Sequence, residues 1–365
     1  MGLQCGIVGL PNVGKSTLFN ALSNAKAEAA NYPFCTIEPN VGVVTVPDQR
    51  LQILESLVTP ERVLPAIIEF VDIAGLVKGA SKGEGLGNQF LANIREVNAI
   101  VHVVRCFDDD NIIHVNGKVD PIGDKEIIDT ELQLKDLESV EKKISKVERT
   151  AKSGDAKAKK EFATLSLYKN HLLQGKSARS LVVPEEDKAV LEDLHLLTIK
   201  PVIYAANVDE KSLPDGNKYV ELLRESVKDE HAQVVIVCAA IEAQIQELTD
   251  PEEKALFLQE YGLEDSGLNK LIRASYSLLD LITYFTAGVK EVRAWTITKG
   301  WKAPKSASVI HNDFEKGFIK AEVIKLKDYQ MYKSESGCRE AGKVAIEGKE
   351  YIVEDGDIMH FRFNV

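Results

Sequence analysis

A phosphate-binding loop near the N-terminus constrains this chain more than any other feature. Residues 9–16 are Gly-Leu-Pro-Asn-Val-Gly-Lys-Ser, a complete match to the pattern G-x-x-x-x-G-K-S. The apolar residues 3–8 before the loop predict a buried strand, and a helical pattern begins at Ser16. In this strand–loop–helix context, backbone N–H groups and the helix N-terminus are predicted to bind the phosphates of a nucleotide.

The same loop offers side chains for phosphate and metal chemistry. We expect Lys15 to place a positive charge against the phosphates, as a binding and catalytic group, and the Ser16 hydroxyl to ligate Mg²⁺. Further nucleotide contacts are predicted from Asn12, Val13, Gly14 and Thr17. The alternative is a glycine-rich turn that binds no ligand, which the flanking strand and helix disfavour.

Composition fits a cytoplasmic protein with more than one domain. The chain has 365 residues, a net charge of -11 and five cysteines, none of them in a C-x-x-C pair. This cysteine pattern suggests neither a disulfide framework nor a zinc site, and it fits a reducing compartment. Because no apolar stretch is long enough to span a bilayer and no export or lipidation pattern is found, we expect a soluble, monomeric protein without membrane contact.

Hydrophobic periodicity divides the chain into three parts. Apolar strand-like runs alternate with helical segments, which predicts a largely parallel α/β domain from residues 1–127 and 200–282, ending in a helix over residues 267–282. Between these two pieces, apolar residues recur at spacings of three and four, so residues 128–199 predict an antiparallel helical hairpin. Residues 283–365 contain short strand-like pieces and glycine turns and predict a small β-rich domain. The predicted strands of the α/β domain are residues 3–8, 41–46, 66–72, 99–107, 201–206 and 233–238.

A second motif, D-x-x-G, follows the apolar run that ends at Val71. Asp72 is expected to hold Mg²⁺, and the N–H of Gly75 is expected to contact the γ-phosphate, so that hydrolysis releases the loop that follows. Thr36 lies between the two motifs, where a switch threonine would close over the metal; its alternative role is that of an ordinary loop hydroxyl. The predicted metal ligands are therefore Ser16, Thr36 and Asp72.

The residue after this motif is Leu76, which cannot orient the attacking water as the glutamine of Ras-like GTPases does. The hydrolysis step must then be assisted by another group. One candidate is Asn12, whose amide oxygen could hold a monovalent cation such as K⁺ against the phosphates, with loop packing or helix capping as the alternative. A second is His114, in a loop predicted to leave a strand end, although most lone histidines are packing or surface residues.

The base-recognition segment departs from the guanine-specific pattern N-K-x-D. Residues 207–210 are Asn-Val-Asp-Glu, so valine replaces the lysine and Glu210 replaces the aspartate that binds guanine. An asparagine such as Asn207 can instead satisfy the N6 donor and N7 acceptor of adenine. Val208 could pack against the ring, and Ala240 could offer backbone groups to the base. The segment therefore favours ATP over GTP.

Taken with these motifs, the chain resembles the Obg-like ATPase family, also called YchF. The resemblance covers essentially the whole length and rests on residues 9–16, 33–40, 72–80, 83–90 and 207–210. It implies a GTPase-like P-loop domain, a helical hairpin insertion and a C-terminal TGS domain. It also implies a preference for ATP over GTP and association with ribosomes.

Two segments carry a local excess of basic residues. Residues 140–160 contain eight Lys/Arg against three Asp/Glu, and residues 290–349 contain thirteen against eight, with aromatic residues between them. Lysine contacts to phosphates with occasional base stacking would suit RNA, whereas the alternative is a charged surface over a small core. The family resemblance favours ribosomal RNA or ribosomal protein as the partner.

Together these features predict a Mg²⁺-dependent nucleoside triphosphatase with slow intrinsic turnover that acts as a nucleotide switch. Three alternatives stay open: a phosphoryl-transfer enzyme with a small acceptor, a GTP-specific switch, and a regulatory binding protein for which hydrolysis matters little.

Overall fold

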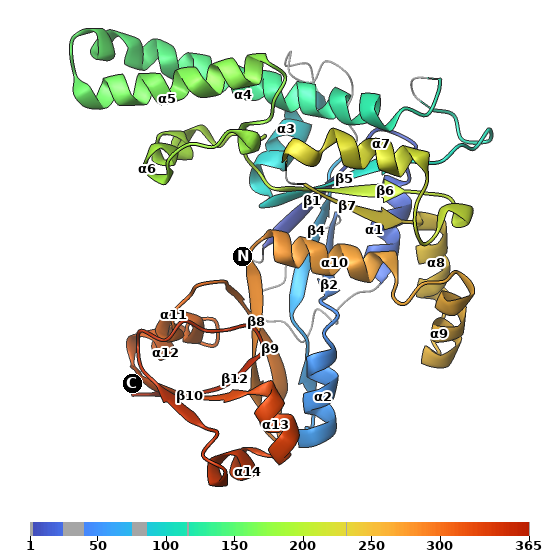
Figure 1. The fold of residues 1–365 in the computed structure, drawn as a ribbon, viewed down its shortest axis with the longest axis vertical. Coiled ribbons are helices and arrows are strands. Elements are labelled where there is room, and N and C mark those ends of the chain that lie inside the picture. Colours follow the sequence, from blue (N-terminus) through green and yellow to red (C-terminus); the bar gives the residue numbers. More distant parts are fainter. Residues whose placement is uncertain (1–2, 25–39, 75–85, 115–116, 231, 365) are drawn as a thin grey trace.

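The structure of this chain is a computed structural model, which describes residues 3–24, 40–74, 86–114, 117–230 and 232–364. Figure 1 shows three parts along the long axis: a central sheet with its helices, a helical hairpin above it and a second sheet below it. The expected Thr36 and Gly75 sites lie outside the described residues.

Within the described residues, the central sheet has six strands in the order β2-β4-β1-β5-β6-β7. Neighbouring strands are parallel except for the antiparallel pair β2 and β4. Parallel strands are covered on both faces, which explains the continuous apolar runs in the sequence. The strands are β1 (Gln4–Val8), β2 (Val41–Thr45), β4 (Ile67–Asp72), β5 (Ala99–Arg105), β6 (Val202–Asn207) and β7 (Gln233–Val237), each within two residues of its predicted position.

Helices connect these strands and cover the sheet. Figure 1 shows α7 and α10 on opposite sides of it. The helices of this part are α1 (Lys15–Asn24), α3 (Leu86–Glu96), α7 (Lys218–Ser226), α8 (Ala239–Glu247), α9 (Pro251–Glu260) and α10 (Gly267–Leu278), with short 3-10 turns at Glu210–Ser212 and Lys228–Glu230. The prediction of one helix over residues 267–282 was wrong at its end, because Asp280 adopts a left-handed φ of 53° and the next strand begins at Leu281.

The predicted helical hairpin consists of α4 (Pro121–Lys152) and α5 (Ala156–Leu173). Gly154, at a φ of +104°, makes the turn between them. Val140, Leu165 and Tyr168 form the buried contact of the pair. The helix α4 begins seven residues before the expected boundary at 128, because its first turns pack against β5 and α7. The chain returns through the turns Ala178–Ser180 and Ala189–Leu194 and through α6 (Glu185–Lys188).

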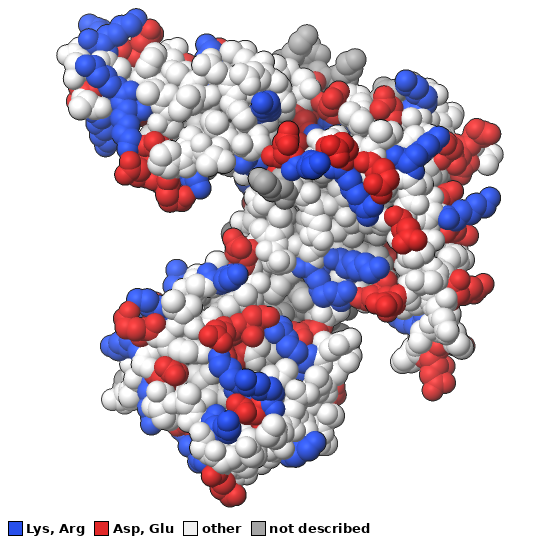
Figure 2. All heavy atoms as spheres, in the orientation of Figure 1, with Lys and Arg blue, Asp and Glu red and all other residues white. Residues whose placement is uncertain are grey.

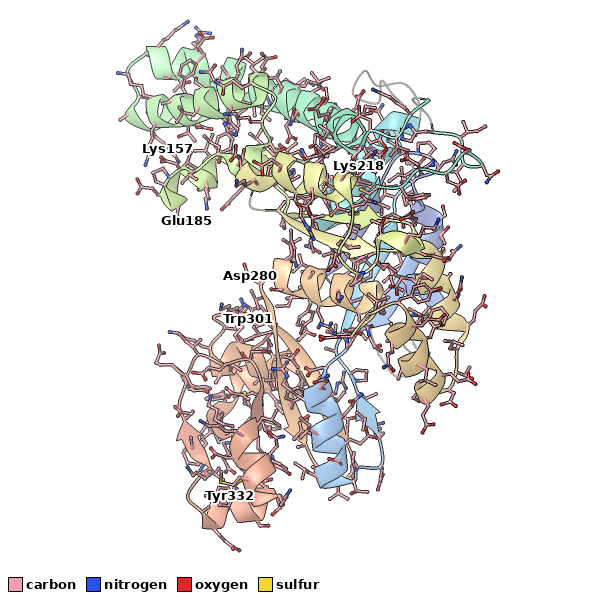
Figure 3. All side chains as sticks on the ribbon, turned by 45° about the vertical axis from the view of Figure 1, so that its right-hand side comes forward. Lys157, Glu185, Lys218, Asp280, Trp301 and Tyr332 are labelled. Carbon is pink, nitrogen blue, oxygen red and sulfur yellow. The ribbon has the colours of Figure 1, made fainter. Side chains whose placement is uncertain are left out.

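The second sheet has the strand order β11-β10-β12-β8-β9-β3 among the described residues. Asp280, labelled in Figure 3, lies where the chain passes from α10 into this sheet. Its strands are β8 (Leu281–Ala287), β9 (Val292–Thr298), β10 (Phe318–Lys325), β11 (Ala345–Glu347) and β12 (Asp357–Phe363), and its helices are α11 (Ala303–Ala307), α12 (Asn312–Lys316), α13 (Leu326–Tyr332) and α14 (Glu335–Glu340). The β-rich C-terminal part is therefore confirmed.

One segment of the N-terminal part joins this second sheet. Between β2 and β4, the chain forms α2 (Gln49–Val58) and the short strand β3 (Val63–Leu64), which pairs in parallel with β9. Figure 1 shows α2 beside β9 and α13, far from the central sheet. The expectation that residues 1–127 belong entirely to the α/β domain therefore misses this excursion, whose partners lie more than 200 residues later in the sequence.

In the described part of the chain, no helix combines the length and the apolar character needed to cross a membrane.

Candidate functional site

The phosphate-binding loop connects β1 to α1 and has the backbone geometry that its glycines predict. Gly14 has a φ of +93°, and a Cβ at this position would lie 2.1 Å from Nδ2 of Asn207. Asn12 is also left-handed, at a φ of 63°. The carbonyl of Gly14 accepts the hydrogen bond of Leu18 N at 2.9 Å, which begins the helix. The loop therefore places a helix N-terminus beside the open end of the sheet.

Lys15 and Asp72 meet at this edge of the sheet. Ile7 of β1 is paired with Asp72 of β4, so the carboxylate lies next to the loop, where Oδ1 accepts a hydrogen bond from Lys15 Nζ. Ser16 and Thr17 are exposed on the first turn of α1. A hydroxyl and a carboxylate are the hard oxygen ligands that Mg²⁺ prefers, so this donor set fits the metal expected from the sequence.

The described residues contain no cluster of three or more His, Cys, Asp or Glu side chains with metal-binding geometry. A divalent cation at Ser16 and Asp72 would therefore take its other ligands from nucleotide oxygens, water or residues outside the described part. This is the usual situation for Mg²⁺, which is bound by one or two protein groups together with substrate phosphates.

Asn207 has a positioning role besides the adenine contact predicted for it. Its side chain is buried, its Nδ2 donates to Val13 O at 2.9 Å, and its Oδ1 accepts from Ala239 N at 3.0 Å. The amide oxygen and one N–H thus connect the phosphate loop to the start of α8. Asn207 therefore positions two loops, and one N–H and one oxygen lone pair of its carboxamide stay available for the predicted contact with a base.

A pocket of about 380 Å³ lies between these loops. It brings together residues of the phosphate loop with residues that follow β5, β6 and β7 in the sequence. The predicted nucleotide contacts in its wall are Asn12, Gly14, Thr17, Asn207, Val208, Glu210 and Ala240. Glu210 is exposed, whereas Val208 is 2% exposed and packs mainly into the core. The pocket volume falls in the range typical of small-molecule sites.

His114 is not part of this pocket wall. Its side chain is buried, and its Nε2 lies 2.8 Å from Oδ2 of Asp124 in the first turn of α4. The neighbouring carbonyl of Ile113 accepts a hydrogen bond from Nδ2 of Asn12 at 3.2 Å. The structure therefore brings the loop of His114 to the phosphate loop but directs the imidazole to α4.

Comparison with known proteins identifies relatives of this chain. A family model described as "50S ribosome-binding GTPase" matches residues 4–150, and one described as "Protein of unknown function (DUF933)" matches residues 281–364. A Haemophilus ducreyi protein named "Ribosome-binding ATPase YchF" is 60% identical over 365 residues, which is 100% of both chains. The chain belongs to the YchF family. A Bacillus subtilis protein of the same name is 58% identical over 367 residues, again with 100% of both chains covered.

A solved member of the YchF family has the same fold. The structure titled "Structure of the Schizosaccharomyces pombe YchF GTPase" is 42% identical, with a TM-score of 0.89 over 99% of this chain and 98% of the other. A GTP-binding protein from Pyrococcus horikoshii matches at a TM-score of 0.60 and 20% identity, which shows the fold alone. The family expected from the motifs is therefore confirmed.

The sequence motifs missed one wall of the pocket. Phe107, Asp108, Asp109 and Ile112 line it, although they belong to no nucleotide-binding motif. The available signal was topological: these residues follow β5, and the carboxyl ends of parallel strands are where α/β sheets bind their ligands.

Proposed function

We propose that this chain is a Mg²⁺-dependent ATPase that acts as a nucleotide switch and binds ribosomes. The observation that carries the proposal is the phosphate loop held against the base-recognition segment by Asn207, with the pocket between them. Its relatives are named ribosome-binding ATPases, and the triphosphatase activity follows from belonging to this family. We place the protein in the cytoplasm and treat it as a monomer.

Nucleotide binding would exchange the partners of Lys15. In the structure, Lys15 and Asp72 neutralise each other at the phosphate loop. A triphosphate would draw the ammonium group to its own oxygens and leave the Asp72 carboxylate, with Ser16, to hold the cation. Bound Mg²⁺ would neutralise charge on the phosphate oxygens. The predicted contacts from Thr36 and Gly75 to this centre stay part of the proposal.

Preference for ATP is supported by the residues at the mouth of the pocket. The position at which guanine-specific switches carry an aspartate holds Glu210 here, and it is exposed beside the pocket. Asn207 has a second N–H besides the one on Val13, which suits a single hydrogen bond to a ring nitrogen of either purine. Glu210, Val208 and the backbone at Ala240 would then set the choice of base.

Hydrolysis needs help beyond Lys15. Nδ2 of Asn12 donates a hydrogen bond to Ile113 O, so the amide oxygen of Asn12 is the atom that would hold a monovalent cation against the phosphates. His114 would have to leave Asp124 to reach the nucleotide. Equal hydrolysis rates in potassium and sodium would contradict the role of Asn12, and a His114→Ala variant with unchanged turnover would remove His114 from the mechanism.

Ribosome binding is supported by the outer end of the helical hairpin. Figure 2 shows Lys and Arg side chains gathered there. Lys152 and Lys160 form ion pairs with Glu148 and Glu186, which reduces the net charge that a partner meets. Phosphate contacts by the other basic residues would weaken with added salt. Co-sedimentation with ribosomes should therefore fall sharply between low and moderate salt, and salt-independent binding would contradict an electrostatic contact with RNA.

The deciding experiment is a parallel titration of the full chain with ATP and GTP. We expect tighter binding of ATP, and we expect Glu210→Asp to shift the ratio toward GTP. Equal or tighter binding of GTP by the wild type would overturn the choice of base. Release of free phosphate supports hydrolysis, whereas a phosphorylated product from an added acceptor would favour the phosphoryl-transfer alternative.

A further inference from the structure

Arg105 is the last residue of β5 and one of the largest fully buried side chains, at 1% exposure. Its guanidinium group donates to the carbonyls of Phe107, Ile112 and Asp109, from Nε at 3.1 Å, from Nη1 at 2.9 Å and from Nη2 at 3.1 Å. The group also lies 4.7 Å from the centre of the Phe107 ring. A buried guanidinium is costly unless its N–H groups are bonded, and here backbone carbonyls of one short loop supply these bonds.

The loop that Arg105 holds is the pocket wall that the motifs missed. Phe107, Asp109 and Ile112 line the pocket, and the same three residues provide the carbonyls. The next residue accepts the hydrogen bond from Asn12 of the phosphate loop. The conformation fixed by Arg105 therefore sets both the surface of this wall and its connection to the phosphate loop.

Arg105 and Asn207 are partners in the sheet. Their Cα atoms are paired in the register of β5 and β6, and Cys106 N donates to Asn207 O at 2.8 Å. Asn207 fixes the phosphate loop and the start of α8, as described above, and Arg105 fixes the loop of residues 107–112. Two adjacent strand ends thus hold the loops that surround the nucleotide pocket.

We propose that Arg105 is a positioning residue for the nucleotide: by holding the loop of residues 107–112, it sets the affinity of the pocket for ATP. This inference rests on the proposed function in one respect, that the pocket binds ATP. An arginine is required because its planar group presents donors in several fixed directions, whereas a lysine ammonium cannot reach three separated carbonyls in this geometry.

The test compares Arg105→Met and Arg105→Lys with a substitution of Arg179, a second arginine that is largely buried, with its side chain 10% exposed. Arg179 donates from Nε to Glu230 at 2.9 Å and from Nη1 to Thr198 O at 3.2 Å, and it does not line the pocket. Arg179→Met therefore controls for the general loss of a largely buried, hydrogen-bonded arginine. Each full-length variant is titrated with a fluorescent ATP analogue and assayed for single-turnover hydrolysis, at a temperature where circular dichroism shows it folded.

We expect Arg105→Met to weaken binding of the analogue at least about tenfold, which is the effect of losing roughly one charge-assisted hydrogen bond. The rate of hydrolysis at saturating nucleotide should change less than about threefold, because the loop sets affinity. Arg105→Lys keeps the charge and should fold. We expect it to weaken binding about fivefold, because the planar guanidinium group with its several donors is lost. Arg179→Met should stay within about twofold of wild type, since destabilisation alone lowers the active fraction and not the affinity.

Wild-type affinity in Arg105→Lys would overturn the inference even where Arg105→Met does not fold. A matching loss of affinity in Arg179→Met would also overturn it, because the effect would then be structural. Failure of the wild type to bind ATP would instead contradict the proposed function itself, so the two failures are distinguishable.

Discussion

The guanidinium group of Arg50 binds both carboxylate oxygens of Asp355, at 2.7 Å from Nη1 to Oδ2 and 3.3 Å from Nη2 to Oδ1. Arg50 also donates to Asp48, which caps the N-terminus of α2, and lies 5.3 Å from the centre of the Phe285 ring. Asp355 in turn accepts a hydrogen bond from Thr283 N at 2.9 Å. This pair therefore fastens α2 to the second sheet.

We predict that Arg50→Met lowers the stability of the second sheet without changing nucleotide affinity. The side chains of Arg50 and Asp355 are 29% and 49% exposed, so the loss should be about 1 kcal/mol. The chain's two tryptophans, Trp295 and Trp301, are partly buried and pack against the core of this part, so their fluorescence during urea unfolding reports on it.

The control for this prediction is Lys302→Met, which breaks the exposed pair of Lys302 with Glu350 in the same part of the chain. Its effect should be within about 0.5 kcal/mol of zero. An unchanged fluorescence midpoint in Arg50→Met would show that the contact to Asp355 contributes no measurable stability.

The close approach of Gly14 to Asn207 leads to a second prediction. Gly14→Ala should reduce ATP binding more than about tenfold, because the new Cβ would lie 2.1 Å from Nδ2 of Asn207 and push the phosphate loop away. Gly154→Ala is the matched control, since Gly154 has a comparable φ of +104° but no atom within 4 Å of the added Cβ. Both variants carry backbone strain, and the clash is confined to Gly14. Equal nucleotide affinity in the two variants would contradict this account.

The central sheet could be predicted from the sequence because its determinants are local. Each buried strand is a short apolar run, and the phosphate loop and Asp72 mark the ends of two strands directly. The excursion that contains α2 and β3 could not be predicted in this way. Its partner β9 begins at Val292, and nothing in the local pattern indicates a contact over that separation.

The sequence predicts the site residues whose side chains bind phosphate or metal better than those whose side chains hold the backbone of the loops. Lys15 and Asp72 are recognisable because their charges belong to fixed motifs, and the structure brings them together. Asn207 was assigned to the base because its carboxamide matches adenine, whereas the structure uses that carboxamide on Val13 and Ala239. Arg105 gave no signal, because one charged residue at the end of an apolar run resembles an ordinary strand end.

These two roles of Asn207 predict different results for one variant. As a positioning residue, Asn207 serves any nucleotide, so Asn207→Ala should weaken ATP and GTP binding alike, by about tenfold or more. As a residue that binds adenine, it would weaken ATP binding alone. Titration of the variant with both nucleotides distinguishes the two, and a selective loss of ATP would support the interpretation made from the sequence.

The last prediction concerns the pH dependence of stability. Glu242 of α8 is 1% exposed, and its Oε1 accepts a hydrogen bond from Gly267 N at 2.6 Å, at the start of α10. Burial raises the pKa of Glu242 from 4.5 to about 7, against the opposing effect of the hydrogen bonds from Gly267 and its neighbours. Between these two pKa values the folded chain keeps a proton that the unfolded chain has lost. The free energy of unfolding must therefore fall as pH rises through this window.

Glu242→Gln removes this titration and keeps an oxygen for the N–H of Gly267. The stability of the variant relative to wild type should then rise by about 2 kcal/mol between pH 5 and pH 8. Urea unfolding followed by circular dichroism measures this difference, because the tryptophans lie in the other sheet. Glu247→Gln, at an exposed position on the same helix, controls for the loss of a carboxylate from α8. A pH-independent difference between Glu242→Gln and wild type would mean that the Glu242 carboxyl group titrates alike in the folded and unfolded chains.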